Sequence, residues 1–258
     1  MQAKGFGCKF VAGNTRHAFL VPFETIAAMN ILRQAWWKIL AVVLLFYTIT
    51  GGFLLPVPRL PILHETIRNM HFHVALWFAM MIVLTFSVVY SVRYLRNPVA
   101  GNDDFAVETA NIGILIGLLG IATGSIWAKF TWGAWWVQDP KLNGAAIAML
   151  IYLAYLVLRG SLQDAQQRAK ISAIYNIFAF GMLIPLLYIL PRLKGVDSLH
   201  PGQGGNPGFS AYDLDNDLRK VFYPAIIGWT LLGLWVASIR IRIRAVERKM
   251  EDKIAVNG

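Results

Sequence analysis

The stretch from Phe72 to Val92 reads FHVALWFAMMIVLTFSVVYSV, and it decides the fold class of this protein. No Asp, Glu, Lys or Arg interrupts it, and Arg93 follows directly after it. A helix needs about 20 consecutive, mostly apolar residues to cross the hydrocarbon core of a bilayer. Because this stretch has that length and composition, it predicts a transmembrane helix.

Five further apolar stretches have the same character. Together they predict an all-α, polytopic membrane protein with about six transmembrane helices, at about 37–55, 72–92, 110–127, 144–158, 171–190 and 221–239. The composition agrees, because 57% of the 258 residues are hydrophobic and only 15% are charged. An ordinary soluble domain has about 25% charged residues. We expect a six-helix membrane domain at 29–245 and a cytoplasmic tail at 246–258.

Residues 1–28 depart from this pattern, since they contain basic residues and no sustained apolar run. A signal peptide has an apolar core of about 7–15 residues, which this segment lacks. We interpret it as an N-terminal extension. It is either a disordered cytoplasmic tail or the product of a start codon placed too early, because Met29 begins a sequence typical of a natural start.

The basic residues of the loops predict the orientation in the membrane. Most of the 24 Lys and Arg residues lie near the N-terminus, after the second helix, between the fourth and fifth helices, and in the C-terminal run RIRIRAVERK. Cytoplasmic loops carry an excess of Lys and Arg, so both termini are expected in the cytoplasm. The net charge of +10 reflects this bias, because the basic residues are too scattered for a nucleic-acid surface.

Helix alternation then places three segments on the same outer face. They are the segment entering the second helix, the Trp-rich segment after the third, and the loop after the fifth. Four of the five histidines belong to this face, namely His64, His71, His73 and His200. His71 and His73 are two residues apart and point to nearly opposite sides of a helix, so at most one should face a given site.

Two imidazoles from separate segments suggest a particular kind of metal site. They are too few for zinc, which takes three or four protein ligands. They are sufficient for an iron that already has four equatorial nitrogens, as in haem. His73 begins a helix that can hold its ring in place, and His200 is the histidine of the loop after the fifth helix. His64 lies in a Pro-flanked loop and is a poorer candidate.

The Trp-rich segment TWGAWWVQDPKL, residues 131–142, has two interpretations. A Trp cluster at a bilayer boundary usually forms an aromatic belt, and nearby Lys and Arg usually extend towards the headgroups. Alternatively, the indoles form one wall of a porphyrin site. The candidate partners for the haem propionates are then Arg68, Lys129 and Lys141. The coincidence of this segment with two candidate axial ligands on one face favours the second interpretation.

The longer segment TGSIWAKFTWGAWWVQDPKL, residues 123–142, resembles the WWD signature of haem-handling proteins, roughly W-G-x-W-W-x-W-D. The matching positions are Trp132, Gly133, Trp135, Trp136 and Asp139. The segment departs from the signature at Gln138, where Trp is usual. With IRNMHFHVA at 67–75 and about six spans, residues 37–239 resemble the CcmC family of system I cytochrome c maturation.

The resemblance implies a function and a set of site residues. It implies that His73 and His200 are the axial ligands of the iron of haem b, with His71 outside the family pattern. The other residues that it associates with haem or its chaperone are Trp127, Trp132, Trp135, Trp136, Asp139, Arg68 and Lys141. An anion repels propionates, so we assign Asp139 to chaperone contact or to orienting the loop.

The resemblance also implies a location and partners. The protein would be a haem-transfer protein of the bacterial inner membrane, rather than a classical enzyme. It would hold haem at the periplasmic face and deliver it to the haem chaperone CcmE, with CcmA, CcmB and CcmD in the same membrane complex.

Three alternatives belong to other functional classes. A CcsA-like or CcmF-like haem lyase would attach haem to apocytochrome, but such proteins are generally longer and carry further histidines. A b-type electron-transfer subunit would need paired histidines at mid-membrane depth, and the predicted spans have none there. A small-molecule transporter would be expected to have charges inside its spans, and the predicted spans contain almost none.

Overall fold

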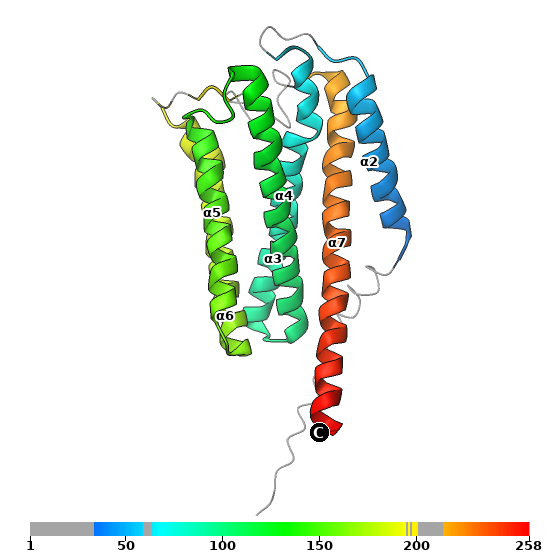
Figure 1. Cartoon of the computed structure of the whole chain (residues 1–258), viewed down its shortest axis with the longest axis vertical. Helices are drawn as coiled ribbons and strands as arrows, with labels where there is room; N and C mark the ends of the chain where they lie inside the picture. Colours follow the sequence, from blue (N-terminus) through cyan, green and yellow to red (C-terminus); the bar gives the residue numbers. More distant parts are fainter. Residues whose placement is uncertain (1–33, 59–62, 195, 197, 201–213, 258) are drawn as a thin grey trace, which may run out of the picture.

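The computed structural model describes residues 34–58, 63–194, 196, 198–200 and 214–257, and no strand occurs in these ranges (Figure 1). The predicted N-terminal extension, 1–28, lies outside the described residues. The elements are α2 (Trp36–Leu54), η1 (His64–His71), α3 (His73–Arg96), α4 (Ala100–Trp132), α5 (Pro140–Ser161), α6 (Ala165–Ile184), η2 (Pro185–Ile189), η3 (Leu190–Arg192) and α7 (Asn216–Asn257). Of these, η1 and η3 are 3₁₀ helices and η2 is a π-helical turn.

Six of the described helical segments are long and apolar enough to cross a membrane, which confirms the predicted fold class. Each of the six overlaps one of the expected spans. The bundle is built around α3 and α4, which pack along each other and bury Leu76, Met80, Leu84, Ile112 and Ile116 between the helices. Large apolar side chains remain exposed on the outer helices, as expected where lipid replaces water as the solvent.

Two helices are much longer than the sequence predicts. The third was expected to begin near Ala110, but α4 begins at Ala100 and includes Asp103, Asp104 and Glu108. The sixth was expected to end near Ile239, but α7 continues to Asn257, so the predicted tail is helical through that residue. Both helices therefore continue through charged residues beyond the apolar stretch that crosses the membrane.

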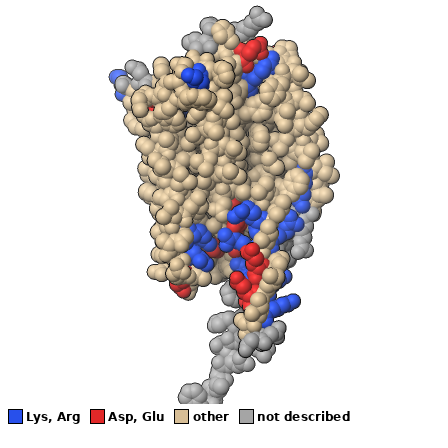
Figure 2. Space-filling model, in the orientation of Figure 1, with Lys and Arg blue, Asp and Glu red and all other residues tan. Residues whose placement is uncertain are grey.

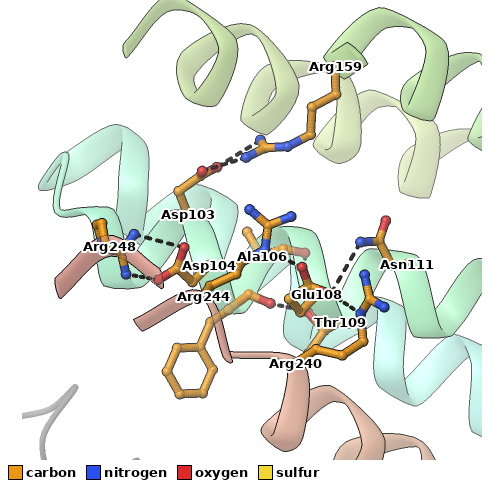
Figure 3. A network of polar contacts seen from close by, with 11 residues as sticks. Asp103, Asp104, Ala106, Glu108, Thr109, Asn111, Arg159, Arg240, Arg244 and Arg248 are labelled. Atoms are coloured by element: carbon orange, nitrogen blue, oxygen red, sulfur yellow. Dashed lines mark hydrogen bonds and ion pairs between the residues drawn. The ribbon is translucent and has the colours of Figure 1, made fainter. Parts of the chain in front are cut away.

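Ion pairs between these two extensions and α5 explain the difference (Figure 3). Arg159 donates two hydrogen bonds to Asp103, and Arg248 pairs with Asp104. Glu108, which is buried, accepts hydrogen bonds from both Arg240 and Arg244. These seven residues form the ionic network. Because each carboxylate has an arginine partner, the charges join the helices instead of ending them.

The molecule therefore has two chemically different ends. At about 1.5 Å per residue, the 33 residues of α4 span about 50 Å, longer than the roughly 30 Å hydrocarbon core. The ionic network lies near the start of α4, towards the end where α2 begins and α7 finishes (Figures 1 and 2). The three segments predicted to share one face meet at the opposite end, which we call the cavity end.

Candidate functional site

A cavity of about 460 Å³ opens at the cavity end between η1, α3, α4, α5 and the His200 segment. This volume lies within the range of about 300–1,000 Å³ that is usual for small-molecule and cofactor sites. Six of the nine site residues expected from the sequence line it: His73, His200, Trp127, Trp132, Trp136 and Lys141. The fold therefore brings together the three segments that alternation assigned to one face.

His73 is held firmly at the start of α3. Its Nδ1 lies 2.8 Å from the carbonyl oxygen of Gly120, so the ring donates that hydrogen bond as the Nδ1–H tautomer. This tautomer leaves a lone pair on Nε2, as a metal ligand requires. The ring also packs on Gly124, where a Cβ atom would lie only 2.5 Å from Cε1 of His73. The His73 ring can therefore occupy this position only because residue 124 is a glycine.

His200 meets His73 from a segment far away in the sequence. The two ring centroids are 6.4 Å apart, with 42° between the ring planes. Metal–imidazole bonds are about 2 Å long, so two imidazoles on opposite sides of one metal would have centroids about 6 Å apart. The observed spacing is therefore close to that of two imidazoles bound to one metal.

The other two histidines of this end do not line the cavity. His71 is 1% exposed and packs against Gly52 of α2. His64 is the first residue of the 3₁₀ helix η1, where a loop was expected, and its φ is positive, at 44°. Only one of the two neighbouring histidines, His73, therefore faces the cavity, in agreement with the expectation that His71 and His73 point in different directions.

Of the four tryptophans expected at the site, three line the cavity and one does not, and Trp77 of α3, which the sequence pattern did not indicate, also lines it. α4 continues through Trp132 and ends at Gly133, which adopts the left-handed conformation (φ 79°) common after a helix C-terminus. Trp127 donates from Nε1 to Thr66 and packs edge-on against His73, with centroids 5.8 Å apart. Trp135 is 60% exposed and lies outside the cavity lining.

The expected basic residues also have separate environments. Lys141 lines the cavity. Arg68 instead donates to the carbonyl oxygens of Gly52 and Leu55 at the end of α2, and it pairs with Glu65. Its guanidinium therefore ties η1 to α2 and is not part of the cavity lining. Lys129 donates to the carbonyl oxygen of Gly133.

Asp139 lies behind the cavity wall and is 1% exposed. Its carboxylate caps the N-terminus of α5 by accepting from the backbone N–H groups of Lys141 and Leu142. It also accepts from the backbone N–H of Leu199. Burial raises the pKa of Asp139, but hydrogen bonds from Ser198 and these backbone groups outweigh it and leave the pKa below its ordinary value. The carboxylate is therefore ionised and directed inwards, which favours the loop-orienting role.

Several residues that position the site were missed from the sequence. Asn69 donates to the carbonyl oxygen of Thr123 and holds η1 against α4, as the Thr66 contact with Trp127 also does. Gly120 and Gly124 support His73. Their G-x-x-x-G spacing, in GIATG, is a known sign of close approach between membrane helices and could have indicated them.

The side chains of the cavity limit the kind of ligand that it can bind. Within the described ranges, no group of three or more His, Cys, Asp or Glu side chains could hold a bare metal ion. The cavity instead offers two imidazoles, indole surfaces and one ammonium group. This donor set suits a flat, apolar, anionic ligand that brings most of its own metal ligands.

Fold and site together define a class: a polytopic helical membrane protein with a Trp-lined, paired-imidazole cavity at one end. The sequence matches the family of heme exporter protein C, CcmC, over residues 17–256, and the chain belongs to that family.

Curated relatives agree with this assignment. The chain is 26% identical over 144 residues to a "Heme exporter protein C" of Haemophilus influenzae, covering 55% of this chain and 56% of that protein. It is 34% identical over 94 residues to a "Cytochrome c biogenesis protein CcsA" of Prochlorococcus marinus and 42% over 94 residues to one of a Synechococcus species. Each of these two alignments covers 36% of this chain and 28% of the relative. The chain thus spans about half of the first relative and under a third of the others.

Proposed function

We propose that this protein binds haem b between His73 and His200 and delivers it to the haem chaperone CcmE during c-type cytochrome maturation. The family supports a role in cytochrome c maturation. The observation that carries the finer proposal is the meeting of the two imidazoles, 6.4 Å between centroids, in a cavity walled by tryptophans. Bis-histidine ligation leaves iron without an open coordination site, which suits a carrier better than an oxygen-activating enzyme.

The residues of the cavity have complementary roles in this proposal. His73 and His200 supply the axial nitrogens, and the indoles of Trp127, Trp132 and Trp136 supply apolar surface for the porphyrin. The ammonium group of Lys141 pairs with a propionate. Trp132 and Trp136 are only partly buried, so the chaperone can approach the cargo from that wall.

The proposed setting is the bacterial inner membrane, with the cavity end at the periplasmic face and both termini in the cytoplasm. The concentration of Lys and Arg at the opposite end supports this orientation (Figure 2). CcmA, CcmB and CcmD are the proposed partners in the membrane, by family resemblance.

The test is a haem measurement on the detergent-purified protein. The wild type should show a low-spin absorption spectrum, with haem b identified by the pyridine haemochrome. His73→Ala and His200→Ala should each lose that spectrum and reduce covalent haem on the chaperone in the same membranes. Purified wild-type protein that takes up no haem when the complete maturation machinery is present would disprove the proposal.

A haem lyase is the second candidate, because the two CcsA relatives named above share 34% and 42% identity with this chain over 94 residues. A lyase would attach haem directly to apocytochrome. The two candidates differ in the first protein that becomes covalently labelled. In membranes with the chaperone and without apocytochrome, haem on the chaperone supports delivery. Labelled apocytochrome in membranes without the chaperone supports the lyase.

A further inference from the structure

The two oxygens of the Asp139 carboxylate bind two parts of the chain that are distant in sequence. Oδ1 lies 2.8 Å from the backbone nitrogen of Lys141 and 3.2 Å from that of Leu142, at the start of α5. Oδ2 lies 2.7 Å from the backbone nitrogen of Leu199, 60 residues away in the sequence. Ser198 adds a side-chain hydrogen bond to the same carboxylate.

Helix capping accounts for only the first of these oxygens. A cap needs one acceptor, and Ser, Thr or Asn provides it about as well as Asp. The second oxygen holds Leu199, the residue immediately before His200, on a segment that belongs to no helix. The hydroxyl of Ser198 in turn accepts from the backbone N–H of His200, at 3.2 Å.

The two candidate iron ligands are therefore held in different ways. His73 is anchored by α3 itself and by the carbonyl oxygen of Gly120. The backbone that carries the His200 ring is anchored at Leu199, through Asp139, to the helix that also carries Lys141. Metal ligands must be held within about 0.5 Å of their productive position, so the second ligand depends on this anchor.

We propose that Asp139 is the positioning residue for His200: its second oxygen sets the distance between the two axial imidazoles. This rests on the proposed haem site. It assigns to the aspartate of the WWD segment a task that neither haem contact nor chaperone contact requires.

The test uses Asp139→Asn and Asp139→Ser in the full-length protein. Both keep a capping oxygen, but neither presents two acceptor oxygens, so α5 stays capped while the bond to Leu199 is lost. The bound haem should lose its six-coordinate, low-spin spectrum, and haem affinity should fall about ten- to hundredfold. Added imidazole should restore the six-coordinate spectrum in both variants, as it should in His200→Ala.

A second measurement needs no haem. Amide hydrogen exchange of the peptide that contains Leu199 should become about tenfold faster or more in Asp139→Asn, because the bond to a charged acceptor is gone. The matched control is Asp217→Asn, which removes an exposed carboxylate from the first turn of α7 and should change neither measurement.

Three outcomes would overturn the inference. They are unchanged exchange at Leu199 in Asp139→Asn, a six-coordinate spectrum retained without imidazole, and a haem loss that imidazole cannot reverse, since the last would indicate collapse of the site. Failure of the proposed function looks different, because wild-type protein and the Asp217→Asn control would then also bind no haem.

Discussion

His71 and His73 are separated by one residue, yet they contact different helices. His71 packs against Gly52 on α2, and His73 packs against Gly124 on α4. Only His73 lines the cavity that His200 also lines. Because the two imidazoles lie in separate environments, their substitutions should have separate consequences.

The first prediction compares these two histidines. His73→Ala should lower haem retention at least about tenfold, since it removes an axial ligand. His71→Leu should retain haem, because Leu fills a similar volume and Nδ1 of His71 has no hydrogen-bond partner in the described part of the chain. Haem per protein after purification measures both. If His71→Leu lost haem and His73→Ala did not, the iron ligand would be His71 and our assignment to His73 would be wrong.

The second prediction concerns the close packing of α4 against His73. A Cβ at position 124 would lie 2.5 Å from the imidazole, so Gly124→Ala should displace the ring and weaken haem binding about tenfold or more. Gly181→Ala is the matched control, since a Cβ there meets nothing within 4 Å. Haem titrations of both variants are the measurement. Equal affinities would mean that His73 does not need this contact.

The third prediction separates the tryptophans by their position. Trp132→Ala and Trp136→Ala should each weaken haem binding by about 1–3 kcal/mol, by analogy with the stacking of a base on an aromatic side chain. That range corresponds to about fivefold to more than a hundredfold in affinity. Trp135→Ala should change it little, because this side chain is 60% exposed outside the cavity.

Phenylalanine at the same three positions tests the aromatic-belt interpretation. If the segment were only a belt, Trp→Phe changes at the three positions should all be mild, since belt positions tolerate exchange between aromatic residues. A similar loss of haem in all three alanine variants would contradict the division between cavity and surface tryptophans.

The fourth prediction addresses the ionic network. Glu108→Gln removes the charge between Arg240 and Arg244 at a buried position, and it should destabilise the protein by about 1–3 kcal/mol. Asp217→Asn, in an exposed pair with Lys220, should leave the stability almost unchanged, because water screens this pair. Thermal unfolding in detergent measures both. Haem binding should survive in each variant, since the network lies at the other end of α4.

The fifth prediction is topological. With Cys8 replaced by Ser, a cysteine at Gln138 should react with a membrane-impermeant thiol reagent added outside intact cells. A cysteine at Gln166, in the first turn of α6 at the same end as the ionic network, should react only after the membrane is opened. Both positions are exposed, so accessibility within the protein does not bias the comparison. The reverse labelling pattern would place the cavity in the cytoplasm.

Individual residues show which features of the structure the sequence patterns predicted and which they did not. The apolar stretch at 72–92 predicted a span that α3 confirms, and the WWD segment predicted the neighbourhood of the cavity. The apolar spans did not reveal that α4 and α7 continue through Asp103 and Arg240, because a charged residue looks the same in sequence whether or not another helix pairs with it. Arg68 failed as a cavity residue for a related reason: its partners are the carbonyl oxygens of α2.

The sequence by itself determined the six helices and the class of chemistry at one end. Both follow from local properties: the length of apolar runs, their alternation across a bilayer, and the presence of imidazoles and indoles near helix ends. The family resemblance singled out His73 and His200, but only the tertiary structure decided how close their rings lie, which indoles face the cavity, and that the second oxygen of Asp139 reaches Leu199. These depend on contacts between residues up to 127 positions apart, from His73 to His200, and only the packing of helices that are distant in the chain creates them.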